Sequence, residues 1–175
     1  GIDFTTRTVT TADGAKYTAD KIITTIPWME FEEIVGMPEE IQKSLSELKY
    51  SSIQTEYFPE NLDTEAQWIY YPDPKLSYHR ILVRHNFCPN SRGYWTETNS
   101  ERIGMEVTND NFKYMNQYAY PLNTIRKPAI MKNLLSWSAE QGVYGLGRWG
   151  EHQHYNSDVT VDLAMKMAER IIAAY

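Results

Sequence analysis

The chain has 175 residues, and 17 basic and 23 acidic side chains give it a formal net charge of −6 at pH 7. This length can bury a hydrophobic core, and a hydrophobic fraction of 42% excludes a disordered chain. The single cysteine, Cys88, excludes a disulfide scaffold, and the net acidity argues against a nucleic-acid-binding protein, which would carry a basic stripe.

The N-terminal segment predicts a β-hairpin. A β-rich stretch over residues 3–11 leads to Asp13-Gly14, a strong hairpin-turn signal, and the return stretch covers residues 16–26. From Lys21 on, the return stretch is nearly continuous in apolar and β-branched side chains, which is typical of a strand buried on both faces. Because such a strand needs neighbours, we expect the chain to begin in the middle of a sheet. Residues 1–4 resemble no signal peptide and no apolar run approaches a membrane span, so we expect a cytoplasmic protein.

The middle of the chain predicts two short helices and then strands. The helices are expected over residues 28–35 and 38–48, and Pro38 is well placed at the first position of the second one. The strands are separated by turn residues at a spacing of ~10 to 14 residues, which favours an antiparallel meander. They are expected over residues 50–58, 67–71, 78–85 and 93–98, with a further one at 114–120.

Two longer helices are predicted in the C-terminal part. One covers residues 125–141, and the other residues 158–175 with Ser157 as its N-cap. The predicted class is α+β, with a mainly antiparallel sheet and flanking helices, as the C-terminal part of a larger fold.

Three patterns imitate known sites. Residues 145–150 spell GxGxxG, but a dinucleotide site needs a helix that opens directly on the glycines, and the next predicted helix begins about seven residues later. His152 and His154 alternate as two metal ligands could, yet no third ligand accompanies them, so a polar pocket wall or a solvated loop is favoured and no metal site is predicted. Cys88 is expected to be a buried small side chain and not a nucleophile.

Tyrosine and arginine suggest a ligand site. The chain has 13 tyrosines and 5 tryptophans, and such faces suit sugars and nucleobases, although tyrosines also simply fill strands. Arg80 lies in a predicted strand and Arg148 in a glycine-rich loop, where a guanidinium could bind phosphate through two donors, while each could also be an ordinary surface residue.

Several stretches, in order along almost the whole chain, resemble a flavoprotein superfamily. Residues 19–27 resemble the strand that closes the FAD domain in amine oxidases and protoporphyrinogen oxidases. Other stretches resemble the UDP-galactopyranose mutase branch of that superfamily. These are residues 70–73, 76–81, 118–122, 147–150 and 158–160. The resemblance implies FAD as cofactor and a UDP-sugar as substrate, whose ring opens and recloses as the furanose after the reduced flavin attacks the anomeric carbon.

The resemblance also implies the roles of individual residues. Arg80 and Tyr120 fall on positions that bind the substrate diphosphate, and His154 and Tyr155 fall where the family usually has a further phosphate-binding tyrosine. Gly147 and Arg148 fall on the loop beside the flavin. Asn156 and Ser157, where the mutases often read Asp-Met, fall where the last helix opens against the flavin. Arg80 is thus expected to face a cleft that Tyr120 and His154 also line, and we identify no catalytic residue.

The resemblance divides the chain into three parts with different roles. Residues 1–27 form a hairpin that returns from the FAD-binding domain, residues 28–124 form substrate-domain helices and sheet, and residues 125–175 return to the FAD domain. The N-terminal FAD-binding segment is missing from these residues, so the chain alone is expected to lack flavin and to be inactive. Two other functions stay open: an amine-oxidase-type oxidoreductase that uses FAD, and a non-enzymatic module that binds sugars or nucleotides.

Overall fold

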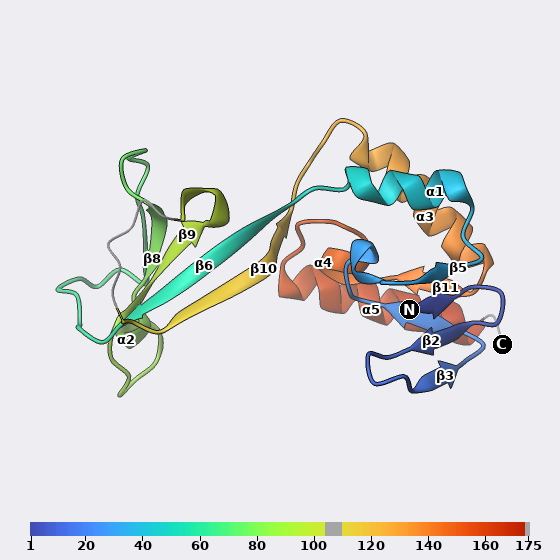
Figure 1. The fold of residues 1–175 in the computed structure, drawn as a ribbon. Coiled ribbons are helices and arrows are strands. Elements are labelled where there is room, and N and C mark those ends of the chain that lie inside the picture. The colour runs from blue at the N-terminus through green and yellow to red at the C-terminus, as the bar shows by residue number, and fades with distance from the viewer. Residues whose placement is uncertain (104–109, 174–175) are drawn as a thin grey trace. The chain divides into compact units, whose positions relative to one another are not determined.

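The computed structural model describes residues 1–103 and 110–173 and divides the chain into two compact units. The first unit consists of residues 1–49 and 121–175, and the second of residues 50–120 (Figure 1). The predicted α+β class is confirmed, because helices accompany a five-stranded antiparallel sheet. The division into 1–27, 28–124 and 125–175 concerns roles and stays a prediction.

The first unit begins with the predicted hairpin. Its four-stranded sheet has the order β3-β2-β1-β5. These strands are β1 (Ile2–Asp3), β2 (Thr8–Thr10), β3 (Lys16–Thr18) and β5 (Ile34–Val35). β2 and β3 pair antiparallel around Asp13 and Gly14, and Gly14 adopts φ +85°, a conformation that glycine tolerates well.

The strand after the hairpin differs from its prediction. β4 (Ile22–Thr24) leaves the hairpin and pairs in parallel with β11 (Val143–Gly145), far along the chain. The expectation that this segment is buried on both faces is wrong for the residues that the structure describes: Ile23 and Ile26 are about half-exposed, because β11 is the one strand that pairs with β4 among them.

The helices of the first unit follow the sequence prediction with two exceptions, one at the end of the first helix and one at residues 147–150, which the sequence predicts as a glycine-rich loop and which form a short helix. They are η1 (Trp28–Glu30), α1 (Glu39–Ser44), η2 (Leu45–Glu47), α3 (Lys127–Glu140), α4 (Gly147–Gly150) and α5 (Ser157–Ala173). The helix predicted over residues 28–35 ends at Glu30, because the backbone of Glu33 and Val35 hydrogen-bonds to β1 instead. α5 is described up to Ala173, so the last two residues of its predicted range lie outside the described part.

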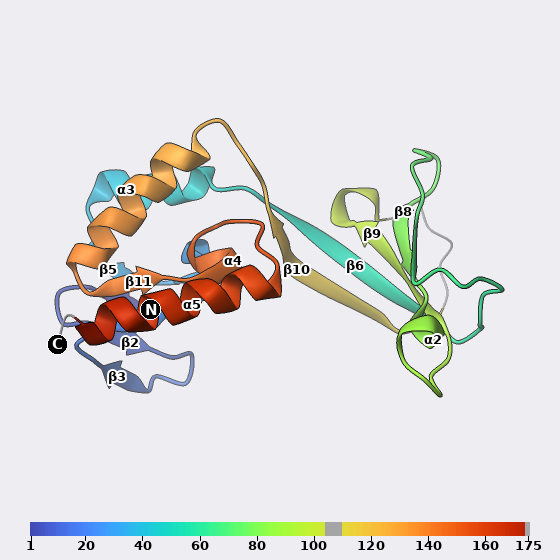
Figure 2. The ribbon, with the colours of Figure 1, turned by 180° about the vertical axis from the view of Figure 1, so that it is seen from behind.

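The core of the first unit lies between its strands and the pair α1 and α3, which run side by side (Figures 1 and 2). Trp28 is buried in it, and its Nε1 donates to the carbonyl of Gly150 at 2.7 Å. α5 contributes one buried side chain, Met167. Val161, Met165 and Ile172 of the same helix remain exposed, so α5 presents an apolar stripe that the described residues leave uncovered.

The second unit is antiparallel as predicted but is only partly a meander. Its sheet has the order β10-β6-β9-β8-β7. The strands are β6 (Tyr50–Phe58), β7 (Trp68–Tyr70), β8 (Tyr78–Leu82), β9 (Tyr94–Asn99) and β10 (Lys113–Pro121), accompanied by α2 (Arg84–Phe87) and η3 (Ser100–Arg102). β7, β8 and β9 are neighbours in chain order, whereas β6 pairs with β9 and β10 and not with β7. These strands confirm the predicted ones, except that β8 ends at Leu82.

A short helix replaces the end of the strand predicted over residues 78–85. The side chain of Asn86 donates to the carbonyls of Thr64 and Ala66, both at 2.8 Å, and this holds α2 against the preceding loop. Cys88 follows α2 and is exposed, so the expectation of a buried cysteine is wrong.

Candidate functional site

A polar row crosses the sheet of the second unit and has Arg80 at its centre. Tyr70 on β7, Arg80 on β8 and Glu97 on β9 occupy opposite positions in the strand ladder. Opposite residues of an antiparallel pair project from the same face, so these side chains emerge together. A register shift at Tyr78/Arg80 adjusts which residue of β8 meets Glu97.

The guanidinium of Arg80 is held from several sides. Its Nε and Nη2 contact Oε2 of Glu97 at 2.8 and 2.6 Å. Its Nη1 donates to the Tyr70 hydroxyl and its Nη2 to the Tyr120 hydroxyl, both at 3.3 Å. The side chains of Arg80 and Glu97 are only 21% and 10% exposed, so this is a largely buried ion pair. The structure thus brings together Arg80 and Tyr120, as the sequence predicted.

The electrostatics keep Arg80 charged. Burial opposes the charge, but the hydrogen bond to Tyr70 and the negative charge of Glu97 outweigh it and raise the pKa of Arg80. His79 lies beside the pair, with Nε2 at 3.9 Å from Oε2 of Glu97. Burial lowers the pKa of His79 despite the opposing charge of Glu97, so at neutral pH this histidine is neutral.

This cluster can offer donors to an anion. Arg80 has five N–H donors, of which the contacts to Glu97, Tyr70 and Tyr120 use four. The Tyr70 hydroxyl accepts from Arg80 and can donate its own proton outward, because Tyr70 is 62% exposed. Glu97 opposes a strongly charged ligand by already neutralising the guanidinium.

Sequence analysis did not identify Glu97 and Tyr70 as site residues. Tyr70 lies in residues 70–73, which resemble the mutase branch, but has no predicted role, and no sequence motif marks Glu97. Their role follows from strand register, which places each opposite Arg80. Pairing the predicted strands β7 and β8 as a hairpin would place Tyr70 opposite Arg80. The bulge between Tyr78 and Arg80 changes the register with β9, so regular pairing of β8 and β9 would not place Glu97 opposite Arg80.

The glycine-rich segment of residues 145–150 forms the end of β11 and the short helix α4 instead of the predicted loop, and its glycines serve chain packing. A Cβ on Gly150 would lie 2.3 Å from the carbonyl oxygen of Thr24, and one on Gly145 would lie 2.2 Å from that of Gly150. Gly147 adopts φ +76° and its N–H donates to Oε2 of Glu151 at 3.1 Å. These contacts explain the glycines of the GxGxxG pattern by close packing of β4, β11 and α4.

The other predicted site residues also belong to the first unit. Arg148 donates through Nη2 to the Tyr155 carbonyl at 2.9 Å. Burial raises the pKa of Tyr155, and His154 is exposed. α5 begins at Ser157, and Asn156 precedes it and accepts from the backbone and side chain of Thr160, both at 3.1 Å, so Asn156 and not Ser157 stands at the cap position.

The predicted residues therefore form two groups, one in each unit. Arg80 and Tyr120 are joined in the second unit, and Arg148 and Tyr155 in the first. A cleft that joins Arg80 and Tyr120 with His154 would span both units, and it stays a prediction.

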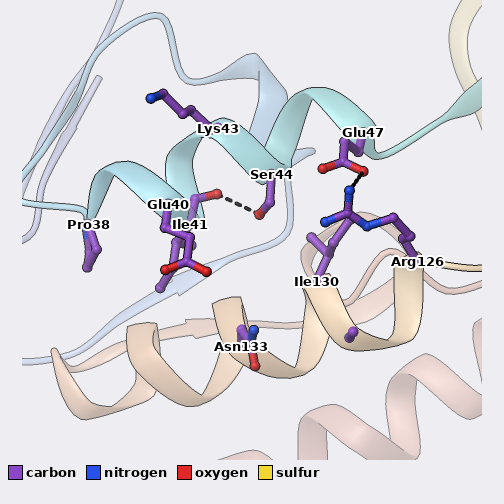
Figure 3. Close-up of a pocket in the computed structure, with 10 residues that line it drawn as sticks. Pro38, Glu40, Ile41, Lys43, Ser44, Glu47, Arg126, Ile130 and Asn133 are labelled. Atoms are coloured by element: carbon purple, nitrogen blue, oxygen red, sulfur yellow. Dashed lines mark hydrogen bonds and ion pairs between the residues drawn. The ribbon is translucent and has the colours of Figure 1, made fainter.

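Two further features of the first unit lie apart from these groups. His152, which was weighed as a metal ligand, is buried with Nε2 at 3.0 Å from the Lys49 carbonyl. A groove of about 510 Å³ runs between α1 and α3, with Ile41 and Ile130 among its lining and the Arg126–Glu47 ion pair (2.8 Å) at one end (Figure 3). None of the predicted site residues lines this groove.

Two classes of feature are absent from the described part of the chain. Within residues 1–103 and 110–173, no three or more His, Cys, Asp or Glu side chains gather as a possible metal site. No described helix is long and apolar enough to cross a membrane.

Comparison with solved structures identifies the fold. A reduced UDP-galactopyranose mutase matches 86% of this chain with a TM-score of 0.70 at 16% identity, and a protein described as a protoporphyrinogen oxidase from Exiguobacterium sp. 255-15 matches 96% with a TM-score of 0.61 at 14% identity. The chain thus shares the fold of these two proteins, whose names are those of two families that its motifs resemble. It spans 40% of the mutase chain and 44% of the other. No protein-family model and no curated protein matches the sequence.

Proposed function

We propose that the chain is part of an FAD-dependent protein of the UDP-galactopyranose mutase type, which interconverts the pyranose and furanose forms of a UDP-sugar. The observation that carries this proposal is the largely buried Arg80, which two tyrosine hydroxyls surround. Arg80, Tyr120 and the additional Tyr70 would bind the substrate diphosphate through N–H and O–H donors. His154 and Tyr155 are the further substrate-binding residues of the proposal.

The start of α5 fits a flavin. The backbone N–H groups of Ser157, Asp158 and Val159 have no acceptor among the residues that the structure describes, and they lie at the positive end of a 17-residue helix. Together with Gly147, Arg148 and Asn156, these N–H groups would bind the electron-rich end of the flavin ring. A bound reduced flavin would supply the nucleophile for the sugar rearrangement, and the residues of this chain would orient the substrate and stabilise charge.

In this proposal, residues of a further segment would bind the rest of the FAD molecule. Among the described residues, β4 pairs with β11 alone, its Ile23 is about half-exposed, and α5 carries an apolar stripe that these residues leave uncovered. We propose that an FAD-binding segment, N-terminal in such flavoproteins, covers these surfaces and completes the cofactor site. Parallel sheets are normally covered on both faces, so an isolated sheet of two parallel strands, such as β4 and β11, is unusual.

Titration of UDP by calorimetry tests the proposal. Arg80→Lys should bind UDP about tenfold more weakly than the wild type, because an ammonium beside Glu97 keeps a charge but loses the planar fork. Arg84→Lys, at an exposed arginine of α2, is the matched control and should bind normally. Equal affinity of wild type and Arg80→Lys would contradict the proposal.

Arg80→Ala needs a stability control. This change leaves the carboxylate of Glu97 largely buried without its cation, so it should also destabilise the fold. Loss of UDP binding in Arg80→Ala therefore counts only if thermal unfolding shows a folded protein, whereas Tyr70→Phe, at an exposed side chain, removes one donor without this complication.

One observation favours a different substrate. Glu97 already takes two donors of Arg80, which lowers the benefit of adding a diphosphate. An oxidoreductase of the amine-oxidase type, with a less charged substrate, fits this arrangement. Oxygen consumption by the flavin-loaded protein, without any UDP binding, would favour this second candidate.

A further inference from the structure

Two exposed aromatic rings stand next to Arg80 on the same face of the sheet. Trp68 and Tyr70 are two residues apart on β7, so both side chains project from one face. Trp68 is opposite Leu82 and Tyr70 is opposite Arg80 in the ladder. Trp68 is 51% exposed and Tyr70 is 62% exposed.

Neither ring is a loosely held surface side chain. Trp68 stacks on Phe87 of α2, with a centroid distance of 6.0 Å and an interplanar angle of 21°. The guanidinium carbon of Arg80 lies 5.6 Å from the centroid of the Tyr70 ring. Each ring is therefore supported by a neighbour while much of its own surface stays in contact with water.

Exposure of this kind is costly for tryptophan, which has a large apolar surface that water contact leaves unfavourably solvated. The intervening residue, Ile69, projects from the opposite face and is opposite the buried Ile81, so Trp68 and Tyr70 are the exposed edge of the face on which Arg80 and Glu97 are largely buried. A flat apolar face beside hydrogen-bond donors is suited to a ring that carries a charged substituent.

We propose that Trp68 and Tyr70 form an aromatic platform that stacks a ring of a phosphate-bearing ligand, either its nucleobase or its sugar, while Arg80 and the Tyr70 hydroxyl bind the phosphates. This inference rests on the proposed function and adds a specificity-determining residue, Trp68, to it. Residues two apart on a strand are separated by about 7 Å, which leaves room for a stacked ring and an attached phosphate side by side.

Binding of four probes to wild type, Trp68→Ala and Trp68→Phe tests the platform. The probes are UDP, UDP-galactose, uridine and inorganic pyrophosphate, measured by calorimetry. Tyr17→Ala is the matched control, because Tyr17 is an exposed strand aromatic of the first unit. Stacking of a base on an aromatic ring predicts about tenfold weaker UDP binding in Trp68→Ala, with an intermediate loss in Trp68→Phe.

The arms separate the possible outcomes. Weaker binding of UDP and uridine with unchanged pyrophosphate assigns the base to the platform, and a larger loss for UDP-galactose than for UDP assigns the sugar. Unchanged UDP and UDP-galactose binding in Trp68→Ala overturns the platform, and it leaves the proposed function standing if Arg80→Lys still weakens UDP. Absence of binding by the wild type overturns both. A monomer–dimer equilibrium that Trp68→Ala abolishes, without any effect on the probes, shows instead that Trp68 contacts a second copy.

Discussion

Acid should destabilise the first unit through His152. Its side chain is 1% exposed, and Nε2 must carry the proton because its partner at 3.0 Å, the Lys49 carbonyl, can only accept. Burial lowers the pKa of His152; the hydrogen bond to Lys49 opposes this, and the nearby charge of Lys127 adds to it. Lys127 is itself buried, with Nζ bound to amide oxygens of Asn123 and Gln153 at 2.6 and 3.2 Å.

The sign and size of the effect follow from proton linkage. A histidine of the unfolded chain titrates near pH 6.5, so between that pH and the lower folded pKa only the unfolded chain binds the proton. The free energy of unfolding that neutral His152 preserves is present above about pH 6.5 and is lost as the pH falls toward the folded pKa, by up to about 1.4 kcal/mol per pH unit. The Lys49 carbonyl also accepts from the backbone N–H of Leu122 at 2.8 Å. Both residues lie where the chain passes between the two units, so protonation of His152 should weaken the hydrogen bonds of that part of the first unit.

Urea unfolding between pH 7.5 and pH 5 measures this effect. His152→Gln keeps an N–H donor near the position of Nε2 but does not titrate, so its free energy of unfolding should depend less on pH than that of the wild type. His154→Gln, at the exposed neighbouring histidine, is the control and should retain the wild-type dependence. Because the carboxylates contribute to all three proteins alike, identical pH slopes for wild type and His152→Gln would refute this reasoning.

Two other predictions concern packing and the cofactor. Gly150→Ala should lower the free energy of unfolding by about 3 kcal/mol, because its Cβ would lie 2.3 Å from the Thr24 carbonyl oxygen. Gly14→Ala should lower the free energy of unfolding by only about 1 kcal/mol, because the added Cβ would have no atom within 4 Å and the one penalty is the positive φ of residue 14. Equal losses of the two variants in urea unfolding would contradict this comparison. The chain purified alone should be colourless and inactive, since residues from one segment cannot assemble a site that needs two. A flavin absorbance band at near one flavin per chain, or mutase turnover, would disprove this expectation.

Local patterns in the sequence determined most helices and strands. The turn residues that bound residues 50–58 and the apolar spacing of residues 125–141 predicted β6 and α3 closely, because each signal lies within one element or directly beside it. The Asp13-Gly14 turn predicted the β2–β3 hairpin for the same local reason. The ordered motifs also indicated proteins whose fold the chain shares, and they indicated that Arg80 and Tyr120 lie together.

Tertiary structure decided what depends on partners far along the chain. Residues 34–35 form a strand because β1 accepts them as a neighbour, and β4 pairs with a strand some 120 residues away instead of with its own hairpin. Strand register, with its bulge beside Arg80, chose Glu97 and Tyr70 as the partners of the guanidinium. Register depends on which faces of several strands can be buried together, a property that no single stretch of sequence contains.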